Sequence, residues 1–309
     1  MTVKFHLPDF TRNYHLNRVL IELLKTYPEY FRDGVAIGSV YGDFPISLWN
    51  GGRSTTTICD KDDMREIIHS FTELKIPMRF TYTNPLITKK HLSDDHCNAV
   101  LRMADNGING VIVVSPELES YIRRIYPRYT ITSSTCKQLK DWEAVCAELE
   151  KDYTMVVLDY NWNNQFDMLE KLPHKDKCEI LINACCPAAC PRRGAHYQYL
   201  GKLQMERLEF YKHHSFNEEF QPSEDFTCEH QNRTLYQVME HSTHVKPDDI
   251  FEKYAPMGFS NFKIEGRSDN LFNLVDTYMY YMAKPEYRDQ LRLIFLMTLE
   301  HNNALEVLQ

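Results

Sequence analysis

Short apolar segments alternate with amphipathic segments along the whole chain. Two of the apolar segments, VIVV at residues 111–114 and MVVL at residues 155–158, are continuous apolar runs, as is typical of parallel strands that are buried on both faces. Several segments start directly after a glycine or proline, as in βα repeats. The pattern predicts eight strands, at residues 3–7, 35–40, 78–82, 111–115, 130–134, 155–159, 179–183 and 259–264.

Between these strands the apolar positions recur at helical spacing. Helices are predicted at residues 14–25, 61–74, 94–106, 116–126, 138–150 and 163–172, with a last helical region at 270–300. Eight strands with helical crossovers predict an α/β fold, a closed (β/α)8 barrel of TIM type that forms one domain over residues 1–309. The rival architecture is an open doubly wound sheet. Eight repeats favour closure, and the first strand is not followed by a Gly-rich phosphate-binding sequence.

Two long segments interrupt this alternation of predicted strands and helices. One covers residues 42–57, after the second strand, and the other is an insertion at residues 185–258, after the seventh strand. Loops of this length in a compact domain are usually functional or disordered. Both segments follow the carboxyl ends of strands, which is the face where barrels of this type carry their sites. We therefore expect the functional site at this face.

Composition and charge narrow the class of protein. The net charge of −8 argues against a DNA partner, which would require a basic surface, although a local basic pocket stays compatible with it. The first residues lack the layout of a signal peptide. The apolar run at 293–297 is far shorter than the about 20 residues that span a bilayer. We expect a cytoplasmic protein with no membrane partner.

Cysteines are concentrated in one short stretch, INACCPAACPRRGAHY at residues 182–197. Cys185 and Cys186 follow the seventh strand, Cys190 is separated from Cys186 by three residues, and Cys228 lies late in the same insertion. An odd total of nine cysteines makes disulfides a poor expectation. Isolated cysteines in or beside helical patterns, namely Cys97, Cys136 and Cys146, are predicted to be packing residues.

Three interpretations of the cysteine stretch remain open. The first is an iron–sulfur cluster, for which grouped cysteines with a distant additional one are the usual ligands. The second is zinc bound by Cys186, Cys190, Cys228 and His230, although paired zinc cysteines are more often two residues apart. The third is a reduced, Pro-rich surface loop. Arg192, Arg193 and His196 either stabilise an anionic cluster or substrate, or form a solvated basic turn.

Polar residues at the other strand ends are candidates to bind substrate, since strand-end positions form the sites of barrels. Lys263, Glu265 and Arg267 alternate along the last strand and therefore point to one side. They are the candidate catalytic residues, with a salt-bridge network that closes the barrel as the alternative. No Ser-His-Asp arrangement or His-Glu-x-x-His helix supports a standard hydrolase. The candidate substrate-binding residues are Tyr41, Arg53, Asn84, Asp159, Arg192, Arg193 and His196.

Residues 258–288, GFSNFKIEGRSDNLFNLVDTYMYYMAKPEYR, resemble a segment of the collagenase-like U32 peptidase family. The resemblance is specific in Lys-Ile-Glu-Gly-Arg at 263–267, and the GVAIGSVYGDF stretch is similar to the second strand of the family. The resemblance implies a barrel with cysteines at the position of this insertion. Some relatives bind [4Fe–4S] clusters through four cysteines in oxygen-independent hydroxylation for ubiquinone synthesis. Others act in RNA hydroxylation or are described as peptidases.

The resemblance implies a [4Fe–4S] cluster held by Cys186, Cys190 and Cys228, with zinc as the alternative metal. Cys185 is the candidate fourth ligand; Cys178 is closer to the wrong end of its strand. The leading expectation is an iron–sulfur barrel enzyme that modifies a small-molecule or peptide substrate by oxygen-independent hydroxylation, redox or sulfur-transfer chemistry. The alternatives are a collagenase-like peptidase and a non-catalytic, cluster-carrying subunit with a related barrel protein as its partner.

Overall fold

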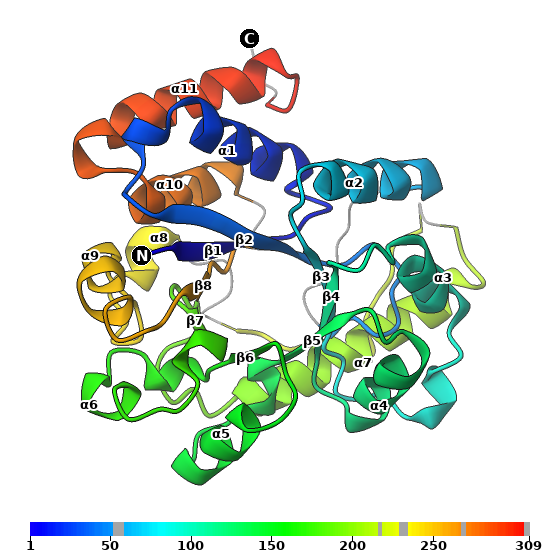
Figure 1. Cartoon of the computed structure of the whole chain (residues 1–309). Helices are drawn as coiled ribbons and strands as arrows, with labels where there is room; N and C mark the ends of the chain where they lie inside the picture. The colour runs from blue at the N-terminus through cyan, green and yellow to red at the C-terminus, as the bar shows by residue number, and fades with distance from the viewer. Residues whose placement is uncertain (52–58, 216–217, 229–233, 267–269, 306–309) are drawn as a thin grey trace.

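Eight parallel strands close into a barrel in the computed structural model, which describes residues 1–51, 59–215, 218–228, 234–266 and 270–305 (Figure 1). Each strand pairs with its sequence neighbours, and β1 also pairs with β8. The predicted (β/α)8 architecture is confirmed. The strands are β1 (Val3–Pro8), β2 (Val35–Gly42), β3 (Met78–Tyr82), β4 (Gly110–Val113), β5 (Thr130–Ser133), β6 (Met155–Val157), β7 (Cys178–Leu181) and β8 (Asn261–Lys263).

Helices surround the barrel in the order that the sequence predicted. The predicted region at 270–300 is two helices, because a turn at Pro285–Tyr287 separates them. The first six are α1 (Tyr14–Thr26), α2 (Lys61–Glu73), α3 (Asp95–Met103), α4 (Pro116–Ile125), α5 (Trp142–Leu149) and α6 (Phe166–Leu169). The others are α7 (Arg193–Tyr211), α8 (Leu235–Val238), α9 (Pro247–Asp249), α10 (Leu271–Met282) and α11 (Arg288–His301). No helix in the described ranges has both the length and the apolarity needed to cross a membrane.

Local sequence signals fix where the surrounding helices begin. Asp60 accepts hydrogen bonds from the backbone of the first turn of α2, and the Asp63 carboxylate accepts one from the Asp60 backbone N–H. Such a capping box satisfies backbone donors that a helix start otherwise leaves unpaired. Ser115 caps α4 in a similar way, and Pro116 occupies the first helical position, where no backbone donor is needed. The start of α4 follows the end of β4 almost at once, whereas α2 begins only after the long segment that follows β2.

The two faces of the barrel wall differ in chemistry. Residues of the strands that face the helices form one continuous apolar core, including Phe5, Val111 and Phe262. Residues that face the barrel interior are partly charged, and Arg79 and Glu179 are almost completely buried there. Buried charges are tolerated when they are paired, and the two side chains form an ion pair of 2.6 Å. The interior is therefore a polar space closed by an apolar shell.

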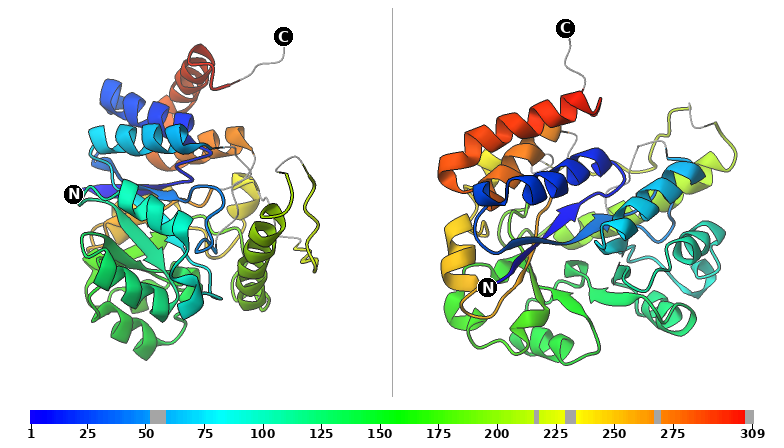
Figure 2. Two further views of the ribbon diagram at one scale, coloured as in Figure 1. Left: turned by 90° about the vertical axis from the view of Figure 1, so that its right-hand side faces the viewer. Right: turned by 45° about the horizontal axis from the view of Figure 1, so that its top comes forward.

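The insertion at 185–258 contains a helix that was predicted from the sequence only as part of a long loop. This helix, α7, lies outside the ring of barrel helices, on the face away from the N-terminus (Figure 2). Gln204 on α7 donates to the Ser47 carbonyl (2.8 Å), and Asn84 donates to the Gly201 carbonyl (3.3 Å). A Cβ atom at Gly201 would lie 2.5 Å from the Asn84 Oδ1, so glycine permits this close packing. The helix consequently covers the carboxyl ends of β2 and β3.

Candidate functional site

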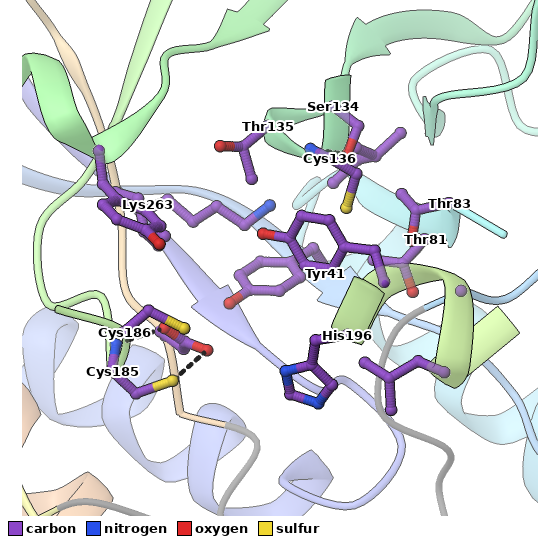
Figure 3. Close-up of a pocket in the computed structure, with 17 residues that line it drawn as sticks. Tyr41, Thr81, Thr83, Ser134, Thr135, Cys136, Cys185, Cys186, His196 and Lys263 are labelled. Atoms are coloured by element: carbon purple, nitrogen blue, oxygen red, sulfur yellow. Dashed lines mark hydrogen bonds between the residues drawn. The ribbon is translucent and has the colours of Figure 1, made fainter. Parts of the chain in front are cut away.

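A cavity of about 130 Å³ lies between the carboxyl ends of the strands and α7. We call it the mouth cavity. Seven strands, β2 to β8, contribute a lining residue from their end or from the residues that follow, and α7 contributes His196, Tyr197 and Leu200. Figure 3 shows its labelled side chains. Its position agrees with the general placement of sites in this class of barrel.

Six of the residues predicted from the sequence line the mouth cavity. Lys263 and Glu265 both face it, as the alternation along β8 predicted. The other four are Tyr41, Cys185, Cys186 and His196. They come from β2, from the loop after β7 and from α7, so one space brings together residues that are far apart in the sequence.

Glu265 holds the start of the cysteine loop in place. Its carboxylate accepts hydrogen bonds from the Cys185 backbone N–H (2.9 Å) and from the Cys185 thiol (3.4 Å). The Asn183 side chain in turn joins the two strand ends, since it accepts from the Glu265 N–H and donates to the Glu265 carbonyl, both at 2.7 Å. The turn that carries the two thiols is therefore fixed to β8 by four hydrogen bonds.

The neighbouring thiol, Cys186, is poised to lose its proton. A hydrogen bond with the Cys185 thiol lowers the pKa of Cys186, and Tyr160 and Arg193 act in the same direction. Burial and the Glu265 carboxylate oppose them. The thiolate is the form of cysteine that binds metals and acts as a nucleophile, and the lowered pKa favours this form at Cys186.

Arg193 and Asp159 form a buried pair that supports this wall. Their side chains are 2.7 Å apart. Arg193 also donates to the Thr135 hydroxyl (2.8 Å) and the Tyr197 hydroxyl (2.8 Å), and its guanidinium lies 4.0 Å from the centre of the Tyr160 ring. Both residues were predicted to bind substrate. In the structure they tie the start of α7 to the ends of β5 and β6.

Asn84 and Arg192, two other predicted substrate-binding residues, make contacts away from the cavity lining. Asn84 is completely buried and binds the carbonyls of Leu48 and Gly201. Arg192 donates to the Thr227 carbonyl (2.8 Å) and lies over the Phe226 ring. Arg53 and Arg267, together with the zinc candidate His230, lie outside the described residues.

Lys263 occupies the floor of the mouth cavity and joins it to the charged interior of the barrel. Its ammonium lies 3.5 Å from Glu179 and 4.1 Å from the centre of the Tyr41 ring. Below it, Glu179 pairs with Arg79 at 2.6 Å and lies 3.6 Å from His6. Burial raises the pKa of Glu179, but Arg79, His6 and Lys263 outweigh it and lower the pKa to about 2. The carboxylate is thus ionised under all ordinary conditions.

Several lining residues were missed by the sequence analysis. Cys136 was predicted to be a packing residue, but it lines the mouth cavity, so that prediction is wrong. It lies in a short 3₁₀ turn, Thr135–Lys137, immediately after β5, and the strand-end rule would have found it. Tyr160, which follows β6, could have been found in the same way, whereas Tyr197 could not, since it comes from α7.

The predicted cluster ligands are divided between two neighbouring segments. Phe226 stacks on the His196 ring, with centroids 4.7 Å apart, and Thr227 accepts the hydrogen bond from Arg192. These contacts bring the backbone next to Cys228 alongside the segment that follows Cys190. Cys185, Cys186, Cys190 and Cys228 are all reduced and partly exposed. Within the described part of the chain, no three Cys, His, Asp or Glu side chains converge on a position for one metal ion.

No family model matches the chain. A curated Methanocaldococcus jannaschii protein described as the uncharacterized protease MJ1657 is 24% identical over 121 residues, which are 38% of this chain and 33% of that protein. The chain thus matches about one third of the length of that relative.

A solved structure described as the U32 peptidase Mk0906 is also similar to this chain. The TM-score is 0.49 at 14% sequence identity, and the match covers 87% of this chain and 94% of that chain. At this identity the likeness concerns the fold alone.

Proposed function

We propose that this chain is a U32-peptidase-like enzyme that modifies a small molecule, or the end of a peptide, in the mouth cavity. The observation that carries the proposal is the meeting of Cys185, Cys186, Lys263 and Glu265 in one cavity at the ends of β7 and β8. Thiols can act as nucleophiles or metal ligands, and an ammonium group and a carboxylate can transfer protons or hold charged groups. Grouped ionisable residues in a cleft at this face of a barrel are the usual mark of a catalytic site.

The size and cover of the cavity favour a small substrate. A cavity of about 130 Å³ holds on the order of ten water-sized groups, since one water needs about 10–15 Å³. The helix α7 is fixed over the mouth through Gln204, Gly201 and Arg193. An intact polypeptide would have to displace this helix, whereas a small molecule or a chain end would not. These features support modification chemistry over cleavage within a long peptide.

As cofactor we propose a [4Fe–4S] cluster, with Cys186, Cys190 and Cys228 as ligands and Cys185 as the fourth candidate. A bound cluster would supply electron-transfer chemistry or an open iron. The residues fit in their chemistry, because all four thiols are free of disulfides and lie on two segments that contact each other. The side chains around Cys186 favour its thiolate form, which is the form that ligates iron.

A peptidase remains the second candidate function, and one feature of the site favours it. Cys186, whose pKa is lowered, lines the same cavity as His196. A thiol and a histidine are the residue types that acyl transfer by a cysteine nucleophile uses. In this case activity would require no iron, and the reaction would consume peptides whose ends reach the cavity.

Anaerobic purification of the full chain, followed by iron, sulfide and zinc analysis, tests the cofactor proposal. We expect about four irons and four sulfides per chain, with a brown colour that bleaches in air. Cys190→Ser should abolish cluster binding. The matched control is Cys146→Ser, because Cys146 lies in α5 and packs against the apolar core.

Two results would contradict the cofactor proposal. Stoichiometric zinc without iron would replace the cluster with the zinc alternative. Equal loss of iron in Cys190→Ser and Cys146→Ser would show that the ligand assignment is not specific to this site.

A further inference from the structure

One part of the long insertion, residues 218–228, lies along the outer side of α7 (Figure 2). We call this part the strap. It forms neither helix nor strand, so side-chain contacts hold it in place. At its start, the Phe220 ring lies 5.6 Å from the Phe210 ring of α7. Further along, Glu224 pairs with Lys202, but both side chains are exposed, and exposed ion pairs contribute little to stability. The strap is therefore held chiefly where its aromatic rings meet the helix.

Phe226 anchors the other end of the strap, at the first turns of α7. Its ring is stacked on the His196 ring, with 4.7 Å between the centroids and 10° between the planes, and it lies 5.3 Å from the Tyr199 ring. The Arg192 guanidinium lies 4.3 Å from the centre of the same ring. These three partners of Phe226 are spaced by four and three residues and so share one face of the helix. Stacked rings and a cation over a ring together give Phe226 a defined position.

The side chain of His196 belongs to the mouth cavity and to the strap contact at the same time. It lines the cavity, and one face of its ring is covered by Phe226. Side chains on a helix can change between staggered rotamers, but the imidazole cannot turn toward the strap while Phe226 is stacked on it. The backbone of α7 is itself fixed over the mouth through Gly201 and Gln204. The contact between the two rings is therefore a part of the cover that can open while the helix stays in place.

We propose that Phe226 is a positioning residue, which holds His196 in the wall of the mouth cavity, and that release of the strap at Phe226 opens the cavity. The inference rests on the proposed function, because it names the route by which a small molecule reaches the same site. It requires no movement of α7 and no change in the barrel. The strap ends at Cys228, so its release would also displace one of the candidate cluster ligands.

The reactivity of two side chains in the iron-free full chain tests the inference. Diethyl pyrocarbonate modifies His196, iodoacetamide modifies Cys136, and mass spectrometry follows both rates. Cys136 reports access to the cavity, because it lines the cavity and is not a candidate cluster ligand. In Phe226→Ala we expect both rates to rise roughly five- to tenfold, as for the loss of the stacking contacts of one ring. Cys146, which lies in α5, is the internal reference, and its rate should not change.

Two further variants separate the position of Phe226 from a general loosening of the strap. Phe220→Ala removes the anchor at the other end, which contacts Phe210 and Arg207 and not the cavity lining. It should leave the rates at His196 and Cys136 close to those of the wild type. Phe226→Tyr keeps an aromatic ring of the same shape and should restore both rates, since the stacking on His196 is retained.

Three outcomes would overturn the inference: Phe226→Ala reacts like the wild type, Phe220→Ala speeds both reactions as much as Phe226→Ala does, or His196 reacts faster while Cys136 does not. Should Phe226→Ala fail to fold, Phe226→Leu, which keeps an apolar side chain without the stacked ring, takes its place in the same comparison. The rates require neither turnover nor iron. A negative result therefore leaves the proposed function standing, and a failure to find a cluster or an activity leaves the expected rates unchanged.

Discussion

Two arginines in this barrel are almost completely buried against one carboxylate each, but their surroundings differ. Arg79 lies inside the barrel, where it pairs with Glu179 at 2.6 Å and otherwise donates to the Ser39 hydroxyl and the Met155 sulfur. Arg193 lies at the mouth, where Asp159 at 2.7 Å is only one of several partners. Thr135, Tyr197 and the Tyr160 ring also contact it.

The different surroundings of the two arginines distinguish the barrel framework, to which Arg79 belongs, from the candidate site, to which Arg193 belongs. The interior pair connects two strands, β3 and β7, and has few alternatives if one partner is removed. The mouth pair connects a helix, α7, to strand ends through a network whose members can partly replace each other. We infer that the interior pair chiefly determines the stability of the barrel, whereas the mouth pair determines the shape of the cavity. Four predictions test this comparison.

The largest effect is expected for Glu179→Gln. The change leaves Arg79 buried without a carboxylate, and losing one partner of a buried ion pair costs about 3–5 kcal/mol. Chemical denaturation should show a loss of that size in the free energy of unfolding. A loss below about 1 kcal/mol, the range of exposed ion pairs, would contradict the role of this pair in the framework.

A smaller effect is expected for Asp159→Asn at the mouth. Arg193 keeps the hydrogen bonds to Thr135 and Tyr197 and the contact with Tyr160, so the loss should be that of one charged hydrogen bond, about 1.5–3 kcal/mol. Because the start of α7 is loosened, alkylation of Cys136 and Cys186, which line the cavity, should become faster. Two results would contradict the distinction between the two regions. One is that Glu179→Gln speeds the alkylation of these cysteines as much as Asp159→Asn does, and the other is that Asp159→Asn destabilises the chain more than Glu179→Gln does.

The third prediction concerns pH. Burial, followed by Arg79, lowers the pKa of His6 from 6.5 to about 3 in the folded chain. As the pH falls from 6.5 toward 3, the unfolded chain takes up a proton that the folded chain does not, so the free energy of unfolding decreases. A single such group contributes a slope of about 1.4 kcal/mol per pH unit.

His6→Gln should remove this part of the slope. The measurement is chemical denaturation at pH 6.5, 5.5 and 4.5, a window in which Glu179, with a pKa of about 2, stays ionised. The matched control is His15→Gln, a change at an exposed position of α1. Identical slopes in wild type and His6→Gln would show that another group governs the acid sensitivity.

The same comparison explains what the sequence could predict. All eight strands were found because each is an apolar run or an alternating segment whose period is independent of the rest of the fold. Lys263 and Glu265 were assigned correctly to one side of β8 for the same reason. The spacing of apolar residues and the positions of strand ends can be recognised in a short stretch of sequence. The barrel framework is built from these local features, so it could be predicted.

The parts that could not be predicted depend on contacts between distant segments. The helix α7, with the sequence RGAHYQYLGKLQMERLEFY, has no apolar stripe, since the residues that it buries are Arg193, Gly201 and Gln204 rather than a row of apolar side chains. The roles of Arg193 and Asp159 as mutual partners likewise follow from the docking of α7 and not from their spacing. Cys136 was misassigned because its neighbours were interpreted as a helix start.

The smallest effect on stability is expected for Arg192→Ala, which tests how the two cysteine segments are held together. Arg192 is exposed, and its hydrogen bond to Thr227 and its contact with Phe226 connect the start of α7 to the segment before Cys228. An exposed substitution of this kind changes the free energy of unfolding by about 0.5 kcal/mol or less. The lost hydrogen bond, worth about 1 kcal/mol, nevertheless acts locally. It should raise the alkylation rate of Cys228 in the iron-free chain roughly fivefold.

The matched control for this change is Lys212→Ala, at an exposed position just past the far end of α7, which should leave the rate at Cys228 unchanged. If the two segments jointly bind the proposed cluster, Arg192→Ala should also lower the iron content after anaerobic purification, because one ligand then spends more time away from the others. A faster reaction of Cys228 with unchanged iron would place Cys228 outside the ligand set and leave Cys185, Cys186 and Cys190 as the thiols to test. An unchanged rate at Cys228 would show that the contacts of Arg192 do not hold this segment against α7.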